Sequence, residues 1–325
     1  MSRALRGLAG NTSDHDVAPP KVGLNPVLRA QYTPGMNAVR IGTRPVGPGH
    51  PVFAVAEIGI NHNGDVNLAK KLVEAAVAAG CDAVKFQKRT IGSVYTAEEL
   101  SRRRESPFGL TNGDLKRGLE LGYDEYAVID RHCRRLGIPW FASCWDLRAV
   151  DFIEAFDPPC YKIASACLTD DDLLRYTRTK GRPVLLSTGM SSREQIDHAV
   201  EVLGDEALVL LHCTSAYPSD VKELNLKVIS WLAERYHVPA GYSGHEVGLA
   251  TTLAAVALGA CLVERHLTLD RAMWGSDQAA SVEPQGFARL VRDIRAITHA
   301  LGDGVKRVHE SEFSARDKLR RTAHQ

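Results

Sequence analysis

The sequence predicts a single (β/α)8 barrel, and three observations support this. The chain has 325 residues, somewhat more than the roughly 250 that one such barrel takes. Short apolar, β-rich runs alternate eight times with longer Ala- and Leu-rich segments of helical period. The strand candidates are apolar almost throughout, as is typical of parallel strands covered by helices. An open, doubly wound sheet is the alternative, because alternation alone does not show that the sheet closes.

The first part of the chain lacks this alternation. Residues 1–38 mix Gly, Asn, Asp, Pro and Arg without a sustained period, which predicts a flexible extension. The expected organisation is therefore an extension over 1–38, the barrel over 39–310 and a C-terminal tail over 311–325.

The elements follow in strict order after the run Gly47-Pro48-Gly49. Glycines 80 and 137 are expected to end the first two helices. The eight expected strands are 52–56, 83–86, 139–142, 160–164, 183–187, 208–212, 239–242 and 261–265. The expected helices are 67–79, 123–136, 149–155, 171–179, 193–203, 226–236, 248–258 and 285–301.

One connection is unusually long. A polar stretch over about 88–122 separates the second strand from its helix. Long connections on the C-terminal side of a barrel strand are frequently lids or insertions over an active site. We expect that role here.

Composition restricts the partners. The 40 basic and 39 acidic residues leave a formal charge of +1, so nothing favours nucleic acid or an anionic membrane as partner. Seven scattered cysteines without a C-x-x-C pair suit a reducing compartment. No run approaches about 18 apolar residues, and no secretory signal is recognisable. A cytoplasmic protein is expected.

Polar residues end all eight expected strands, which is where barrel enzymes carry their catalytic groups. They are Glu57, Lys85, Gln87, Ser143, Lys162, Ser165, Ser187, Thr188, His212, Thr214, Ser215, Ser243, His245, Glu264 and His266. A buried ammonium group is costly unless an anion meets it. Lys85 and Lys162, with serines around them, therefore indicate a multiply charged ligand such as a phosphate ester. The alternative is a pair of structural lysines, each paired with a carboxylate.

Two histidines suggest a metal. His245 and His266 end adjacent strands and could share an ion with positions left open. Glu57 and Asp277 add carboxylates, and such a mixed set favours Mn²⁺ or Mg²⁺ over a closed zinc site. Structural histidines remain the alternative on this signal alone.

Seven sequence blocks carry a family resemblance. They are AEIGINHNGD (56–65), VKFQK (84–88), YKIAS (161–165), LSTGM (186–190), LHCTSAYP (211–218), GYSGHE (241–246) and VERH (263–266). In order and in content they resemble the signature blocks of sialic acid (N-acetylneuraminate) synthases, and the resemblance extends from about 50 to about 310.

The resemblance implies a metal-dependent transferase that condenses phosphoenolpyruvate with an open-chain N-acetylmannosamine-type sugar and releases phosphate. By this likeness His245 and His266 hold the divalent ion, with Mn²⁺ expected before Mg²⁺. Glu57 and Asp277 position water or move protons, and Gln87 contacts substrate. The residues expected to hold phosphoenolpyruvate are Lys85, Ser143, Lys162, Ser165, Ser187, Ser215 and Ser243.

The sequence departs from the family pattern near the expected sugar site. Ala164-Ser165-Ala166-Cys167 stands where the family usually has Gly-Ser-Gly and an acid that binds sugar hydroxyls. A thiol at Cys167 removes a charged acceptor, so the sugar expected here need not be N-acetylmannosamine. Ser143-Cys144-Trp145-Asp146 likewise replaces the more usual Thr-Pro-Phe-Asp.

A further departure concerns the C-terminus. The family typically continues into an antifreeze-like domain that brings an arginine to the sugar's acyl group across a dimer, whereas this sequence ends at Gln325. Three readings remain open: another subunit supplies the arginine, Arg320 or Arg321 replaces it, or the substrate carries no acyl group. The partners expected are therefore the two substrates and either a homodimer mate or a separate subunit.

Two other functions stay open at this point. A Schiff-base aldolase would use Lys85 or Lys162 as nucleophile and need no metal. A non-catalytic relative would bind sugar or phosphate without turnover.

Overall fold

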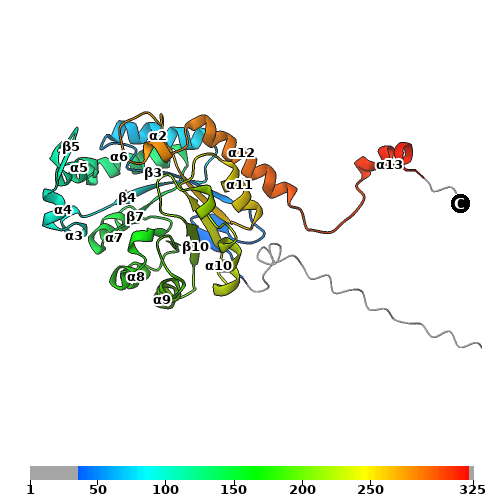
Figure 1. Ribbon diagram of the computed structural model, residues 1–325, viewed down its shortest axis with the longest axis horizontal. Coiled ribbons are helices and arrows are strands. Elements are labelled where there is room, and N and C mark those ends of the chain that lie inside the picture. Colours follow the sequence, from blue (N-terminus) through cyan, green and yellow to red (C-terminus); the bar gives the residue numbers. More distant parts are fainter. Residues whose placement is uncertain (1–35, 322–325) are drawn as a thin grey trace, which may run out of the picture.

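Eight parallel strands close into a barrel in the computed structural model, which describes residues 36–321 (Figure 1). Strand β12 pairs with β3 and completes the ring, so the open-sheet alternative is excluded and the predicted barrel is confirmed. The strands are β3 (Phe53–Gly59), β4 (Ala83–Lys88), β7 (Trp140–Cys144), β8 (Tyr161–Ile163), β9 (Val184–Ser187), β10 (Leu208–Cys213), β11 (Ala240–Gly244) and β12 (Leu262–His266). Each lies within a few residues of its predicted range.

Eight helices cover the outside of this ring. They are α2 (Val66–Ala78), α6 (Tyr123–Leu136), α7 (Leu147–Glu154), α8 (Asp171–Arg178), α9 (Arg193–Leu203), α10 (Val228–Tyr236), α11 (Ala250–Ala257) and α12 (Pro284–Ala300). Their ends follow local chemistry: the Asp65 carboxylate accepts from the backbone of Asn67 and starts α2, and Gly137 ends α6 in the left-handed conformation (φ 72°). Apolar side chains on the inner face of each helix pack against the strands.

The core has two layers because side chains alternate across each strand. In β3, Ala54 and Ala56 belong to the layer between strands and helices, whereas Phe53 and Val55 belong to the layer inside the barrel. The alternation continues to the C-terminal end of the strand, so Glu57 faces inward. The same period directs a polar residue inward from each of the other strands, and this places the candidate site.

A short antiparallel ribbon packs against the inner layer at the N-terminal end of the barrel. It consists of β1 (Val39–Ile41) and β2 (Arg44–Val46), and its buried Val39, Ile41 and Val46 join the cluster inside the barrel. No strand is predicted from the sequence in this stretch.

The long connection after β4 folds into a small unit of its own. It contains α3 (Ile91–Val94), α4 (Ala97–Ser101), the two-stranded β5 (Arg103–Ser106) and β6 (Gly109–Thr111), and α5 (Asn112–Leu119). We call this unit, residues 89–122, the insertion. Figure 1 shows its helices and β5 gathered at one side of the barrel. The insertion reaches the loop after β12, where the rings of Phe108 and Trp274 lie 6.0 Å apart between centroids. The Trp274 carbonyl also accepts a hydrogen bond from Asn63, in the loop after β3, at 2.8 Å.

The insertion lies very close to the loop after β3. A Cβ at Gly64 would lie 2.1 Å from the carbonyl oxygen of Gly118 in α5, and a Cβ at Gly118 would lie 2.2 Å from the Phe108 ring. The absence of a side chain at Gly64 therefore permits the loop to approach the backbone of α5, and its absence at Gly118 leaves room for the Phe108 ring.

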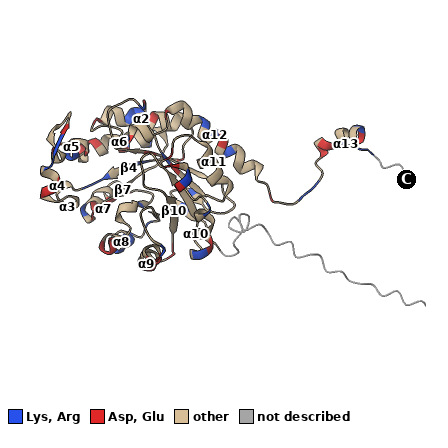
Figure 2. Ribbon diagram, in the orientation of Figure 1, with Lys and Arg blue, Asp and Glu red and all other residues tan. Residues whose placement is uncertain are grey.

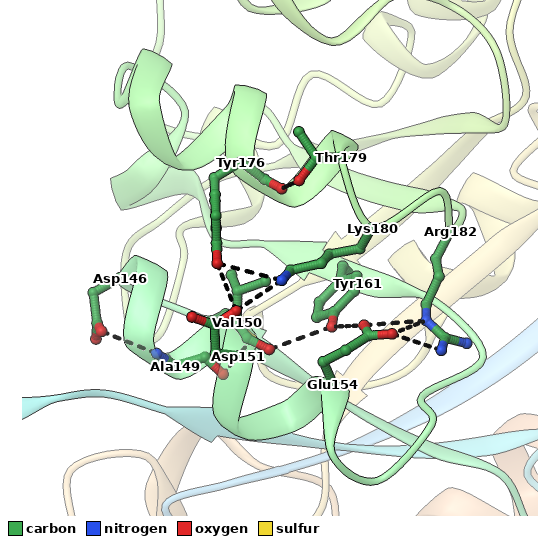
Figure 3. A network of polar contacts seen from close by, with 11 residues as sticks. Asp146, Ala149, Val150, Asp151, Glu154, Tyr161, Tyr176, Thr179, Lys180 and Arg182 are labelled. Atoms are coloured by element: carbon green, nitrogen blue, oxygen red, sulfur yellow. Dashed lines mark hydrogen bonds and ion pairs between the residues drawn. The ribbon is translucent and has the colours of Figure 1, made fainter.

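Polar contacts join the outer helices α7 and α8 (Figure 3). Asp151 accepts from Lys180 at 2.7 Å and from the Tyr176 hydroxyl at 2.6 Å, and Glu154 pairs with Arg182 at 2.8 Å. Most of these groups are partly exposed, so the pairs orient the helices more than they stabilise them. Figure 2 shows both signs of charge spread over the outer helices, in keeping with the near-zero net charge.

The structure describes only part of the two predicted terminal segments. The extension expected over 1–38 falls outside the described residues except for its last three. In the C-terminal region, α13 (Phe313–Leu319) stands apart from the barrel at the end of an extended segment (Figure 1). Within 36–321, no helix combines the length and apolar character that crossing a bilayer requires.

The close approach at Gly64 leads to a stability prediction. Gly64 and Gly137 have nearly the same φ (73° and 72°), but a Cβ at Gly137 would meet nothing within 4 Å. We expect Gly137→Ala to cost about 1 kcal/mol for its left-handed backbone. Gly64→Ala should cost roughly 2–4 kcal/mol because the added methyl also displaces α5. Urea unfolding of the two variants measures the difference, and equal losses would contradict the packing role.

Candidate active site

A cavity of about 190 Å³ opens at the C-terminal end of the barrel strands. Of the predicted site residues, all but Cys167 and Asp277 line it. Those that do are Glu57, Lys85, Gln87, Ser143, Lys162, Ser165, Ser187, Ser215, Ser243, His245 and His266. The two lysines and the two histidines of the sequence prediction thus face one common space.

Four charged side chains alternate in sign in the buried base of this cavity. Lys85 Nζ lies 2.8 Å from Glu57 Oε2 and 3.5 Å from Glu264 Oε1, and Lys162 Nζ lies 2.9 Å from both carboxylate oxygens of Glu264. All four side chains are at most 5% exposed. Because each charge touches an opposite one, the cluster is neutral as a whole. We call these four residues the charge cluster.

Hydroxyl groups surround the charge cluster. Lys85 donates to Ser143 Oγ at 2.9 Å, and the Ser243 hydroxyl donates to Glu264 Oε1 at 3.1 Å. The buried Ser187 Oγ has no hydrogen-bond partner within the described chain. An unpaired buried hydroxyl beside two ammonium groups suits an incoming oxyanion.

The two carboxyl groups of the charge cluster differ in acidity. Burial opposes the charge of Glu264, but Lys162 and Lys85 outweigh it and lower its pKa to about 2. Burial raises the pKa of Glu57, and Lys85 offsets this only in part. Glu264 therefore acts as the permanent counter-ion, while Glu57 is the better placed to hold and release a proton.

Two serine hydroxyls lie close to Gly189, just after β9. A Cβ at Gly189 would lie 2.3 Å from Ser215 Oγ and 2.8 Å from Ser165 Oγ. Ser165 Oγ also accepts from the Gly189 backbone N–H at 3.1 Å. The missing side chain at position 189 leaves room for two hydroxyls to converge on the same space.

His245 and His266 stand together at the other side of the cavity, with ring centroids 5.4 Å apart. Nδ1 of His245 lies 3.0 Å from the Thr214 carbonyl oxygen, and Nδ1 of His266 is buried without a hydrogen-bond partner among the described residues. Burial lowers the pKa of His266 to about 3, so its ring is neutral at pH 7.

Two features of the pair suit a divalent ion. His266 is neutral, which is the form that binds a metal, and the Thr214 carbonyl at Nδ1 of His245 orients that ring. Burial opposes the charge of His245, but Cys213, whose Sγ lies 3.8 Å from Nδ1, raises its pKa overall. Within residues 36–321, no group of three or more His, Cys, Asp or Glu side chains is arranged to hold an ion.

The two predicted site residues that do not line the cavity, Asp277 and Cys167, lie in different parts of the structure. Asp277 Oδ2 lies 3.8 Å from His266 Nδ1, at the rim of the histidine pair. Cys167 is 6% exposed and packs in the outer core rather than along the cavity, and burial raises its pKa to about 12. His212, another strand-end residue, approaches the Leu224 carbonyl through Nε2 and does not line the cavity.

Glu264 and Tyr217 are among the cavity residues to which the sequence assigned no role. Glu264 was noted only as a strand end, although it lies two residues before His266 and the period of a strand puts both on one face. Tyr217, in the HCTSAYP block, packs its ring 4.1 Å from that of His245. Because residues two apart on a strand share a face, the position of Glu264 in the cavity could have been predicted. Tyr217 lies in a loop, to which this rule does not apply.

A polar chain connects the site to the insertion. Gln87 donates to Glu57 Oε1 at 2.8 Å, and Arg89 donates to the Gln87 side-chain oxygen. The Arg89 guanidinium lies 4.3 Å from the centre of the Trp145 ring and 3.5 Å from Glu120. The loop that begins the insertion is thereby connected to the carboxyl group of Glu57.

Comparison with known proteins agrees with this geometry. Residues 72–306 match the NeuB family. The chain is 39% identical over 279 residues to the human N-acetylneuraminate-9-phosphate synthase, covering 84% of this chain and 78% of that protein. It is 34% identical over 298 residues to the N,N'-diacetyllegionaminic acid synthase of Legionella pneumophila, covering 89% and 84%.

A solved structure shares the fold. The N-acetylneuraminic acid synthetase of Leptospira borgpetersenii, in complex with citrate, superimposes with a TM-score of 0.75 at 32% identity. The match covers 88% of this chain and 99% of that one.

The charge cluster leads to a stability prediction. Glu264→Gln leaves two buried ammonium groups with Glu57 alone, which should cost about 3–5 kcal/mol at pH 7. Adding Lys162→Met removes the surplus charge, so the double variant should recover much of that loss. Urea unfolding of the wild type, both single variants and the double variant gives the coupling free energy. Additive losses would show that the two side chains act independently.

Proposed function

The chain belongs to the NeuB family, and from this premise we propose that it is a nonulosonic acid synthase. It would join phosphoenolpyruvate to the aldehyde of an open-chain, N-acetylmannosamine-type sugar and release phosphate. One observation carries the proposal: Lys85, Lys162, His245 and His266 line the same cavity. Cationic groups for an enol phosphate thus face the two imidazoles across a space of substrate size.

The lower part of the cavity would bind phosphoenolpyruvate. Lys85 and Lys162 supply charge, and the unpaired Ser187 hydroxyl supplies a donor. Ser165 and Ser215 converge beside Gly189 and would accept the remaining oxygens. Glu264 keeps both amines charged and positioned before the substrate arrives, so little reorganisation is needed on binding.

The upper part would take the sugar. A divalent ion, Mn²⁺ or Mg²⁺, held by His245 and His266 would act as Lewis acid on the sugar carbonyl. Tyr217, packed on His245, forms a wall of this space. Asp277, beside His266, would orient the water consumed in the reaction.

The reaction would proceed in two stages. The enol carbon of phosphoenolpyruvate forms a bond to the aldehyde carbon, and positive charge develops at the neighbouring carbon that carries the phosphate ester. Water adds there, and the carbon–oxygen bond to phosphate then breaks. Glu57 would stabilise the cationic carbon, accept one proton of the water and pass it to the oxygen of the former aldehyde. The second proton of the water leaves with the phosphate as the ketone forms, while the lysines stabilise the departing phosphate.

The compartment, the catalytic part of the chain and the partner subunits also belong to the proposal. All seven cysteines are unpaired, which supports a cytoplasmic enzyme. We assign the reaction to the barrel over 39–310 and treat 311–325 as a tail. The proposed partners are phosphoenolpyruvate, the sugar, and a homodimer mate or a separate subunit.

The aldolase alternative has one observation in its favour. Burial lowers the pKa of Lys162, as a Schiff-base lysine requires. Lys162 is, however, held by both oxygens of Glu264, which keeps its amine engaged. Lys162 is therefore assigned to anion binding.

A phosphate-release assay with phosphoenolpyruvate, Mn²⁺ and a panel of aldoses tests the proposal. We expect release that depends on the sugar and stops with chelator, and His266→Ala should lower it by about 100-fold or more because an ion ligand is lost. His299→Ala, an exposed histidine on α12, is the matched control and should keep wild-type activity. Chelator-resistant turnover that borohydride traps would instead establish the aldolase, and no turnover with any aldose would favour a binding protein.

A second variant tests the anion-binding role. Lys162→Ala should raise the KM for phosphoenolpyruvate roughly 10- to 100-fold, because a charge-assisted hydrogen bond is worth about 1.5–3 kcal/mol. The KM for the sugar should change far less. Steady-state kinetics with each substrate varied in turn measures both constants, and an unchanged KM for phosphoenolpyruvate would contradict the assignment.

A further inference from the structure

A buried ion pair outside the active-site cavity lies directly behind the two histidines. Arg265 Nη1 is 2.9 Å from Glu246 Oε1, and both side chains are at most 1% exposed. Arg265 stands between Glu264 and His266, which line the cavity. Because neighbouring residues of a strand point to opposite faces, Arg265 points to the outer face of β12. We call Arg265 and Glu246 the outer ion pair; the proposed reaction gives it no role.

The outer ion pair connects the two segments that carry the histidines. Glu246 directly follows His245, and Arg265 directly precedes His266. Nη1 of Arg265 donates to the Glu246 carboxylate, and Nη2 donates to the Glu246 carbonyl oxygen at 2.5 Å. One side chain of β12 therefore holds both the backbone and the side chain of the residue after His245.

Other groups fix the carboxylate of Glu246 in a single orientation. Its Oε2 accepts from the Tyr242 hydroxyl, on β11, at 2.8 Å. Its Oε1 accepts from the hydroxyls of Thr251 and Thr252, in the first turn of α11, at 2.8 and 2.9 Å. The outer ion pair is thus held by β11, β12 and α11 at once.

A glycine leaves the space that the outer ion pair occupies. Gly244 and Arg265 are register partners on β11 and β12. A Cβ at Gly244 would lie 2.6 Å from Glu246 Oε2 and 3.1 Å from Arg265 Cδ. Any side chain at position 244 would therefore displace the pair.

Stability alone does not account for the outer ion pair. Replacing a buried ion pair by apolar side chains of similar volume is often neutral or stabilising. Arg265 Nε is, in addition, buried without a hydrogen-bond partner among the described residues, which adds a cost. Apolar contacts are non-directional, so what the pair supplies beyond them is a fixed geometry beside both histidines.

We propose that Arg265 and Glu246 are positioning residues, which hold the rings of His245 and His266 in the relative position from which both bind one divalent ion. The inference rests on the proposed function, because that ion belongs to it. The ring centroids lie 5.4 Å apart before any ion is bound. Ligands that are ordered in advance bind more tightly, since less free energy is lost in ordering them.

The test is a titration with Mn²⁺, in which the electron paramagnetic resonance signal of the free ion gives the Kd without substrates. Arg265→Met combined with Glu246→Gln should raise this Kd about tenfold or more, as is typical when a group that orients a metal ligand is lost. Each single variant leaves a buried polar or charged group without its partner, so the double variant should be more stable than either. Urea unfolding of the same samples measures this stability.

The two readouts separate positioning from a structural role. In the double variant stability should return while the affinity for Mn²⁺ does not. Arg182→Met is the matched control, because it breaks an ion pair with Glu154 (2.8 Å) on the outside of the barrel, just before β9. Its Kd should stay within about twofold of the wild type. A double variant that binds Mn²⁺ as tightly as the wild type overturns the proposal, and so does an equal loss of affinity in Arg182→Met.

The titration also distinguishes this proposal from the proposed function, since it requires no turnover. Mn²⁺ affinity that falls in the double variant, in a protein that releases phosphate with no aldose, would support the positioning role and refute the synthase. Sugar-dependent phosphate release by the wild type, with unchanged Mn²⁺ affinity in the double variant, would do the reverse. A wild type that binds no Mn²⁺ would overturn both the positioning role and the metal-dependent reaction.

Discussion

Two carboxyl groups and two ammonium groups alternate inside the barrel, and each lies against a group of the opposite kind. Glu264 touches Lys162 through both oxygens and reaches Lys85, which in turn touches Glu57. Buried charges of this kind are tolerated only when they are paired. The arrangement keeps two cations ready beneath the histidine pair. The serines surround these cations, and the space for the substrates lies above them.

The charge cluster also explains how much of the site could be predicted. Glu57, Lys85, Ser143 and Lys162 follow apolar residues at the ends of strands, so a period of two directs them to one interior as soon as a barrel is assumed. The barrel itself was predictable because eight apolar runs alternate with helical segments. The family resemblance is confirmed by the comparisons, but the individual roles of these residues remain proposals.

The features that could not be predicted depend on contacts between segments far apart in the sequence. Glu264 was overlooked as a partner because nothing in the sequence shows that it meets Lys162, which is 102 positions away. The long connection was expected to be a lid or insertion, but its strands and helices were not predicted. Its position depends on the close approach of Gly64 to Gly118, residues that are far apart in the sequence. Cys167 follows a strand like the other candidates, but a short 3₁₀ turn directs it into the core.

Apolar side chains of the strands fill the barrel below the charge cluster, and the ribbon of β1 and β2 packs against them at the N-terminal end, so the cavity is closed on that side. Glu264 precedes His266 by two residues on β12 and lies one layer deeper. An enol phosphate on the lysines would sit beneath a sugar at the histidines, and both would share one exit. Under the proposed reaction the enol phosphate must enter first, and a sugar that arrives early would obstruct it. Excess acceptor should then act as a dead-end inhibitor. This ordered kinetic pattern would follow from the packed interior at the opposite end of the barrel.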